Sequence, residues 1–308
     1  MIDLSVVVVS FNTRDLLRSC LESVCASASY QSTSPLSVEV WVVDNASSDG
    51  SANMVRREFP QARLVVNDSN VGFAAANNQA IQQANGQYVL LLNPDTVVLD
   101  DALLRLVDFA AGHEKVGAVG ARLLNPDGSF QHSCFRFPNL WMSFFDFFPL
   151  NHRVTNSRLN GRYPLNRYEK PFPIDHPLGA CLLVRKSVVD QVGLLDEDFF
   201  IYCEEVDWCL RIKQAGWDIY CVPEAKVIHY GAQSTQQFRG RMLVELHRSR
   251  NLLFEKHYSP LFRWASRQIV RLGLAREALR GVVALVTGKL SRRDLDERLE
   301  SYWQIFRM

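Results

Sequence analysis

The sequence has no uninterrupted run of about 18 apolar residues, the length that a membrane-spanning helix needs. Its seven cysteines include no Cys-x-x-Cys pair, which disfavours a zinc knuckle or a disulfide framework and is typical of reduced, buried thiols. No basic leader precedes the first apolar stretch, so we expect no secretory signal and a cytoplasmic protein. No Gly-x-Gly-x-x-Gly follows that stretch and no Walker lysine motif is present, which disfavours dinucleotide-binding and P-loop enzymes.

The composition is typical of a soluble globular protein, with 47% hydrophobic and 22% charged residues in a chain of 308. The net charge of +1 is distributed unevenly between the C-terminal segment and the rest of the chain. Residues 241–308 carry 14 Lys and Arg against 7 Asp and Glu, so the remainder has a net charge of −6. We therefore expect the acidic body and the basic C-terminal segment to have different partners.

Strand-like and helical patterns alternate through the first hundred residues. A helix after the first strand shows one apolar stripe, and Thr13 is its candidate cap. This alternation predicts an α/β fold with a mainly parallel central sheet flanked by helices. The strand-like stretches are residues 4–9, 38–43, 63–67 and 88–92, and further on 116–123, 181–184, 219–222 and 226–228.

The stretch 88–92 is an unbroken apolar run, which predicts a strand buried on both faces. Asn93-Pro94 ends it, because proline removes a ladder donor and holds the preceding residue extended. Asp95 is therefore expected just past the carboxyl end of a central strand, where open α/β sheets bind ligands. A hard carboxylate there suits a divalent cation that holds a diphosphate, and a simple turn aspartate is the alternative.

Two more polar loops leave the carboxyl ends of neighbouring strands, one from Ser10 to Asn12 and one from Asp44 to Gly50. In a doubly wound sheet these loops converge with Asp95 on one crevice. Asp44 could accept a hydrogen bond from a ribose hydroxyl or a base imide. Capping of the following helix is an equally good interpretation of the same residue.

Residues 130–173 are aromatic, contain prolines and lack clear periodicity. We interpret them as an insertion that covers the crevice on the acceptor side, with Phe144, Phe145, Phe147 and Phe148 favouring packing over cofactor stacking. Gly179 would let the backbone approach a ligand closely, although a bulge would explain it too.

A second polar cluster lies at the start of a helix predicted from about Glu204 to Gly216. Its carboxylates, Glu204, Glu205 and Asp207, either stabilise the helix dipole or supply a general base. His229 follows a strand, a position where a structural role is more common than a ligand role.

In this order, the motifs resemble the inverting GT-A-fold glycosyltransferases of family two, especially their bacterial rhamnosyltransferase-like branch. The resemblance covers about residues 3–240, so we interpret 1–240 as the catalytic domain and 241–308 as a helical extension. The motifs are Val7-Val8-Val9-Ser10-Phe11-Asn12, Val42 to Ser51, Asn70-Val71-Gly72-Phe73 with Asn77-Asn78, Leu92-Asn93-Pro94-Asp95, Gly179-Ala180, Glu204-Glu205-Val206-Asp207 and Ile228-His229-Tyr230-Gly231.

The resemblance implies roles for these positions. Asp95 would be the principal ligand of Mg²⁺ or Mn²⁺, since Asn93 replaces the first carboxylate of the family's Asp-x-Asp motif, and His229 would complete the site. Glu205 would be the catalytic base, with Glu204 as the other candidate because the family usually has Glu-Asp here. Donor-binding residues would be Ser10, Phe11, Asn12, Asp44, Asn70, Gly72, Phe73, Asn77 and Asn93, and acceptor-binding residues Gly179, Ala180 and Asp207.

The implied reaction is the transfer of a sugar from a nucleotide-diphosphate donor, with dTDP-rhamnose favoured over UDP-hexoses, to a saccharide or lipid-linked acceptor in cell-envelope polysaccharide synthesis. A degenerate protein that only binds sugar nucleotides is the alternative, favoured by Asn93 and Glu205. A sugar-nucleotide pyrophosphorylase is disfavoured, because it would need a glycine-rich basic loop after the first strand. The residues at that position, Ser10 to Thr13, include neither a glycine nor a basic residue.

The basic segment after residue 240 mixes apolar residues with arginines at helical spacing. Such a helix fits peripheral contact with the anionic cytoplasmic face of the inner membrane. Helices that pack on the catalytic domain, or on another subunit in a homo-oligomer, are the alternative. Nucleic acid is disfavoured because no recognised binding motif accompanies the charge.

Overall fold

The computed structural model describes residues 2–30, 35–231 and 239–308, and its internal contacts divide the chain into two units. We call them the sheet unit and the helical unit. The helical unit takes in residues 137–162, from the middle of the stretch interpreted above as an insertion, together with the C-terminal segment. The sheet unit comprises Met1–Arg136, Tyr163–Phe200 and Glu204–Ser234, and the helical unit comprises Phe137–Arg162, Ile201–Cys203 and Thr235–Met308.

The strands all belong to the sheet unit. They are β1 (Leu4–Ser10), β2 (Val38–Asp44), β3 (Arg63–Val66), β4 (Tyr88–Leu92), β5 (Thr96–Val98), β6 (Val116–Leu124), β7 (Phe130–Gln131), β8 (Cys134–Phe135), β9 (Phe172–Pro173), β10 (His176–Pro177), β11 (Cys181–Arg185) and β12 (Asp218–His229). Ten of these described strands form one sheet in the order β3-β2-β1-β4-β11-β6-β12-β5, with β7 beside β6 and β9 beside β12. The remaining two, β8 and β10, pair with each other.

The sheet brings several chain segments to one edge. Parallel pairing of β1 with β2 places Ser10 opposite Asp44, and β4 runs parallel to β1 on its other side. Antiparallel β11 begins where β4 ends, with Cys181 opposite Leu92. Since β12 runs parallel to β6, its last residue, His229, lies at the same edge. The mainly parallel α/β sheet predicted from the sequence is confirmed.

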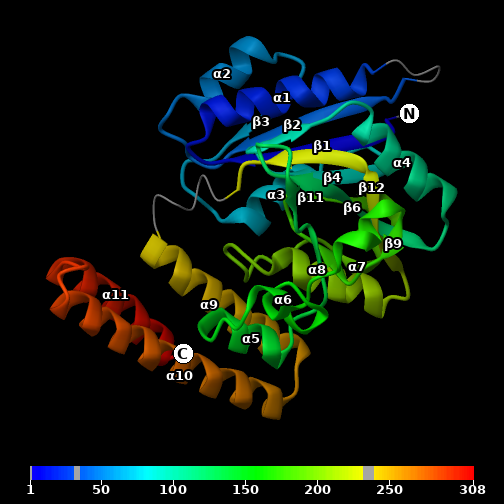
Figure 1. Ribbon diagram of the computed structural model, residues 1–308. Helices are drawn as coiled ribbons and strands as arrows, with labels where there is room; N and C mark the ends of the chain where they lie inside the picture. Colours follow the sequence, from blue (N-terminus) through cyan, green and yellow to red (C-terminus); the bar gives the residue numbers. More distant parts are fainter. Residues whose placement is uncertain (1, 31–34, 232–238) are drawn as a thin grey trace. The chain divides into compact units, whose positions relative to one another are not determined.

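Helices cover both faces of this sheet. They are α1 (Arg14–Ala28), α2 (Ser51–Glu58), α3 (Phe73–Ile81), α4 (Ala102–Gly112), η2 (Leu165–Glu169), α7 (Lys186–Val192) and α8 (Glu204–Gln214). In Figure 1, α1 and α2 lie over one face, and α3 and α8 lie over the other. The chain adds β2 and then β3 on one side of β1, and it adds β4 on the other side. Because the crossovers are right-handed, the helices that connect strands in these two opposite directions lie on opposite faces of the sheet. Every residue of β4 is buried, as expected for a central strand.

Two local expectations need correction. Thr13 precedes α1 but its side chain does not cap the helix, because its hydroxyl bonds to Ser10 Oγ at 3.0 Å. The backbone nitrogen of Arg14 instead donates to Asp49 Oδ2 at 2.7 Å. The strand-like stretches 219–222 and 226–228 form one strand, β12, with an irregular register between them. A proline is tolerated at such an irregularity.

The helical unit consists of α5 (Leu140–Phe147), α6 (His152–Thr155), η1 (Arg158–Asn160), α9 (Arg239–His257), α10 (Pro260–Val286) and α11 (Arg292–Phe306). Its core takes one buried residue from each long helix and α5: Phe147, Val244, Leu274 and Ile305. Helices α5 and α10 approach closely at Gly273, where an added Cβ would lie 2.1 Å from Phe147 Cγ. No helix in the described ranges has the length and apolarity to cross a bilayer.

Candidate functional site

The loops after β1 and β2 are tied together at the sheet edge. Ser10 ends β1, and Phe11 and Asn12 follow it. The Asn12 backbone nitrogen donates to Ser47 Oγ at 3.0 Å, and Asn12 Oδ1 accepts from the Ser48 nitrogen at 2.8 Å. Asn12 adopts a left-handed φ of 54°, which its short polar side chain tolerates. The two loops predicted to bind the donor therefore lie side by side.

The capping interpretation of Asp44 is wrong for α2, whose N-cap position is Gly50, so Asp44 acts in the loop before that helix. Its Oδ1 accepts from the Ser47 backbone nitrogen at 2.8 Å, which is turn chemistry. Its Oδ2 is buried and has no hydrogen-bond partner among the described residues. Because buried carboxylate oxygens are nearly always paired, this atom is suited to accept a hydrogen bond from a bound ligand.

The segment from Asn70 to Phe73 is positioned by its own side chains and by Phe200. Asn70 Oδ1 accepts from the Gly72 nitrogen at 3.0 Å. Gly72 has a φ of +91° and touches Phe200, whose carbonyl would lie 2.7 Å from an added Cβ, so only glycine fits here. The Phe73 nitrogen donates to the same carbonyl at 2.7 Å. The amide of Asn77 donates to the Phe73 carbonyl within α3.

Asp95 and His229 are brought together by pairing of β5 with β12. Asp95 is only 5% exposed, and its Oδ1 lies 3.5 Å from His229 Nε2. Thr96, the next residue, stands opposite His229 in the antiparallel ladder. Asn93 joins this turn to β11, because its backbone nitrogen donates to the Ala180 carbonyl at 3.0 Å. The predicted metal and acceptor segments are therefore neighbours at the edge.

Gln131 orients the imidazole of His229, a role that the sequence does not reveal. Gln131 Nε2 donates to Asn125 Oδ1 at 2.9 Å and to the His229 carbonyl at 3.2 Å. Its Oε1 is therefore the acceptor facing His229 Nδ1, at 2.8 Å. In the neutral imidazole, an Nδ1 that donates to Gln131 leaves the lone pair on Nε2, the nitrogen that faces Asp95, which is the arrangement of a metal-binding histidine.

The residues at this point fit a divalent cation bound together with a diphosphate. No group of three or more His, Cys, Asp and Glu side chains is arranged around a metal position in the part of the chain that the structure describes. Asp95 and His229 would supply one oxygen and one nitrogen ligand. Cations that serve phosphate substrates are held by one or two protein ligands, with phosphates and water completing the shell. Two protein ligands are therefore sufficient.

The predicted base candidates differ in exposure. Glu204, the first residue of α8, is 5% exposed, and its Oε2 has no hydrogen-bond partner among the described residues. Burial, with the neighbouring charge of Glu205, raises the pKa of Glu204 well above its ordinary value. Glu205 is half-buried, and its side chain lies against Gly179, where an added Cβ would be 3.5 Å from Glu205 Cγ. Asp207 binds Arg211, with 2.8 Å between Oδ2 and Nε, which anchors the helix.

Known proteins resemble this chain in sequence and in fold. Residues 5–193 match the family described as Glycosyl transferase family 2. The chain is 31% identical to the N-acetylglucosaminyl-diphospho-decaprenol L-rhamnosyltransferase of Mycobacterium tuberculosis, over 83% of this chain and 86% of that protein. It is 21% identical to the dTDP-rhamnosyl transferase RfbF of Shigella flexneri, over 72% of each. The mannosyltransferase PcManGT of Pyrobaculum calidifontis, solved with GDP-Man and Mn²⁺, shares the fold with a TM-score of 0.56 at 19% identity, over 98% of this chain and 85% of that one.

Proposed function

This chain belongs to glycosyl transferase family 2, and on that basis we propose that it transfers a sugar from a nucleotide-diphosphate donor to a saccharide or lipid-linked acceptor, with inversion. The favoured donor is dTDP-rhamnose, because relatives at 31% and 21% identity are named as rhamnosyl transferases. A UDP-hexose is the alternative donor. The diphospho-decaprenol in the name of the mycobacterial relative supports a lipid-linked acceptor in polysaccharide synthesis.

The observation that carries this proposal is the buried pair of Asp95 and His229, with 3.5 Å between Oδ1 and Nε2 and with Nδ1 of the imidazole held by Gln131. These two residues would hold Mg²⁺ or Mn²⁺. When bound, the cation supplies Lewis-acid stabilisation of the leaving diphosphate. Asp44 Oδ2 accepts from the nucleoside, and the Ser10 to Asn12 backbone lies beside the base.

Glu205 is the better candidate for the base. It is more exposed than Glu204, and it faces Gly179 in the predicted acceptor segment. A Glu204 side chain that stays protonated adds no like charge beside Glu205 and accepts no proton itself. Glu205 takes the proton of an acceptor hydroxyl while that oxygen bonds to the anomeric carbon and the bond from that carbon to the diphosphate oxygen breaks. One displacement inverts the anomeric centre.

The test is transfer from dTDP-rhamnose or UDP-hexoses to a synthetic N-acetylglucosaminyl-diphospho-polyprenol, with and without Mn²⁺. We expect Glu205→Gln to bind the donor normally and to lower the transfer rate by a factor on the order of 10²–10⁴, the usual contribution of a general base. Glu22→Gln, an exposed exchange on α1, is the matched control and should leave the rate unchanged. Transfer by Glu205→Gln at the parent rate would show that Glu205 is not the base. Absence of transfer with every donor would favour the binding-only alternative.

A further inference from the structure

Helix α10 exposes apolar side chains on the face opposite the one that packs on its neighbours. Successive residues of an α-helix are rotated by about 100° around its axis, and with this rotation the exposed apolar side chains fall within a sector about 100° wide. Gln268 is a polar residue within that sector. The buried residues of α10 occupy the opposite side and are mostly small: Ser266, Gly273, Leu274 and Gly281. The exposed set, which we call the α10 stripe, consists of Leu261, Trp264, Leu272, Ala275, Leu279, Val282, Val283 and Val286.

Arginines border the α10 stripe on both edges. By the same helical geometry, Arg267 and Arg271 lie along one edge, and Arg276 and Arg280 lie along the other. The whole helix carries five arginines and a single glutamate. An exposed apolar surface bordered by one sign of charge is the pattern of a helix that lies in the plane of a membrane surface.

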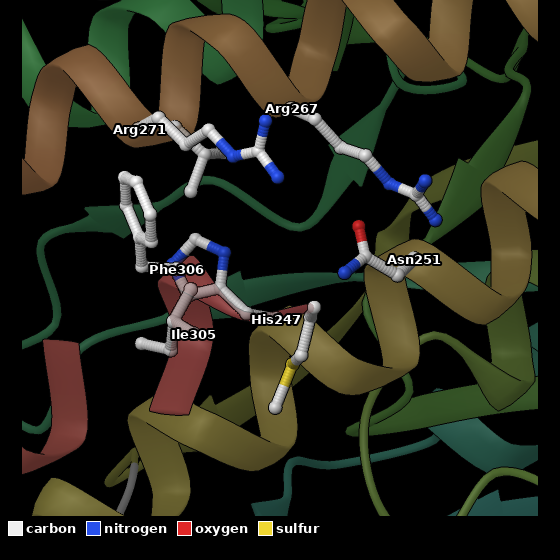
Figure 2. Close-up of a pocket in the computed structure, with 8 residues that line it drawn as sticks. His247, Asn251, Arg267, Arg271, Ile305 and Phe306 are labelled. Carbon is white, nitrogen blue, oxygen red and sulfur yellow. The ribbon is translucent and has the colours of Figure 1, made fainter. Parts of the chain in front are cut away.

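Figure 2 shows the edge formed by Arg267 and Arg271. Both guanidinium groups reach from α10 toward His247 and Asn251 of α9, and Arg271 stacks over the Phe306 ring of α11 at 5.2 Å. Burial lowers the pKa of His247 to about 4, so it is neutral at pH 7. The positive charge at this pocket therefore comes from the two arginines, of which Arg267 also pairs with Glu255 of α9, with 3.0 Å between Nη2 and Oε1.

We propose that α10 binds the surface of an anionic phospholipid membrane, with the α10 stripe among the acyl chains near the headgroups and the bordering arginines on lipid phosphates. Trp264 within the stripe suits that depth, because tryptophan is enriched where apolar chains meet the headgroups. Each Arg near an anionic leaflet adds to the attraction, and the stripe adds buried apolar area.

Charge decides between a membrane and a second copy of the chain as the occupant of this face. Two α10 stripes packed against each other would bring arginine edges against arginine edges, and the single glutamate of each helix, Glu277, already pairs with Arg276 and Arg280 of its own helix at 2.8 and 3.1 Å. Like charges across an interface are unfavourable. An anionic lipid surface satisfies the apolar stripe and both arginine edges together.

The test is cosedimentation of the full chain with vesicles of phosphatidylcholine and phosphatidylglycerol at 7:3, compared with phosphatidylcholine alone. We expect binding to the anionic vesicles, weaker at high salt, with a partition coefficient at least about tenfold lower on the neutral ones. Leu272→Ser with Leu279→Ser should lower it at least about tenfold, and the fold should persist because both side chains are 66% exposed. The matched control is Leu150→Ser with Leu159→Ser, two leucines of the helical unit that are 57% and 50% exposed and lie outside α10, and it should bind as the parent does.

Three results would overturn the proposal. The parent could fail to bind anionic vesicles, or the Leu272 and Leu279 double variant could bind them as tightly as the parent with an unchanged circular dichroism spectrum. Alternatively, sedimentation velocity could show that the double variant converts a dimer to a monomer without changing vesicle binding, which would assign the α10 stripe to a second copy. The vesicles contain neither donor nor acceptor, so each result is independent of sugar transfer.

Discussion

Replacement of Gln131 by methionine tests whether Gln131 orients the imidazole of His229 in the proposed cation site. Methionine fills a similar volume but removes three hydrogen bonds, one from His229 Nδ1 and two from the Gln131 amide to Asn125 and the His229 carbonyl. Without the Gln131 acceptor, the His229 imidazole is free to carry its proton on Nε2, where the cation would bind.

The expected size of the effect follows from these contacts. Loss of the hydrogen bond that orients a metal-binding histidine lowers metal affinity by about 10–100-fold. That factor corresponds to about 1.4–2.8 kcal/mol of binding free energy. The lost hydrogen bonds should also lower the free energy of unfolding by about 1 kcal/mol each, which leaves a folded protein to measure.

The assay is a Mn²⁺ titration in the presence of dTDP, with free Mn²⁺ measured by electron paramagnetic resonance. Gln131→Glu is the matched control, because its carboxylate still accepts from Nδ1 and should keep the affinity within about threefold of the parent. Gln131→Met with the parent affinity for Mn²⁺, in a protein that is folded by circular dichroism, would refute the role of Gln131 in orienting His229.

Three further predictions concern stability. Gly273→Ala should lower the free energy of unfolding of the helical unit by about 1–3 kcal/mol in urea titrations, because the added methyl overlaps Phe147, although alanine in place of glycine usually favours a helix. Burial lowers the pKa of His247 to about 4, so as the pH falls this residue takes up a proton in the unfolded chain before it does so in the folded chain. Acid therefore favours the unfolded chain. Between pH 7 and pH 4.5, the free energy of unfolding should drop by about 2–3 kcal/mol more in the parent than in His247→Gln. The pKa of Glu204 is raised by burial, so its contribution to stability is present at low pH and is lost as the pH rises. Glu204→Gln should therefore have a higher melting temperature than the parent at pH 8. A lower melting temperature there would contradict the raised pKa of Glu204.

Several parts of the site could be predicted because their signals are local. The strand Tyr88–Leu92 has the bounds expected from an apolar run ended by Asn93-Pro94. Helix α8 begins at Glu204, as expected from the cluster of carboxylates in its first turn. The alternation of strands and helices orders the sheet through right-handed crossovers, which places the polar loops at one edge.

Other features depend on contacts between residues far apart in the chain. Gln131 lies in the two-residue strand β7 and meets His229 only because β7 pairs with β6, so no sequence pattern marks it. Threonine is a common helix cap, but the Thr13 side chain does not cap α1. Asp49, from the loop after β2, accepts the hydrogen bond from the first backbone nitrogen of that helix. Residues 137–162 have no clear periodicity, yet their phenylalanines complete the core of the helical unit.

The most direct test of the proposed cation site is the melting temperature of the full chain with dTDP-rhamnose, measured with and without Mn²⁺. A ligand that binds only the folded state raises its apparent stability. We predict a clear increase when donor and Mn²⁺ are present together, and no such increase for Asp95→Ala. An equal increase without Mn²⁺, or in Asp95→Ala, would contradict the assignment of Asp95 and His229 to a cation that holds the donor.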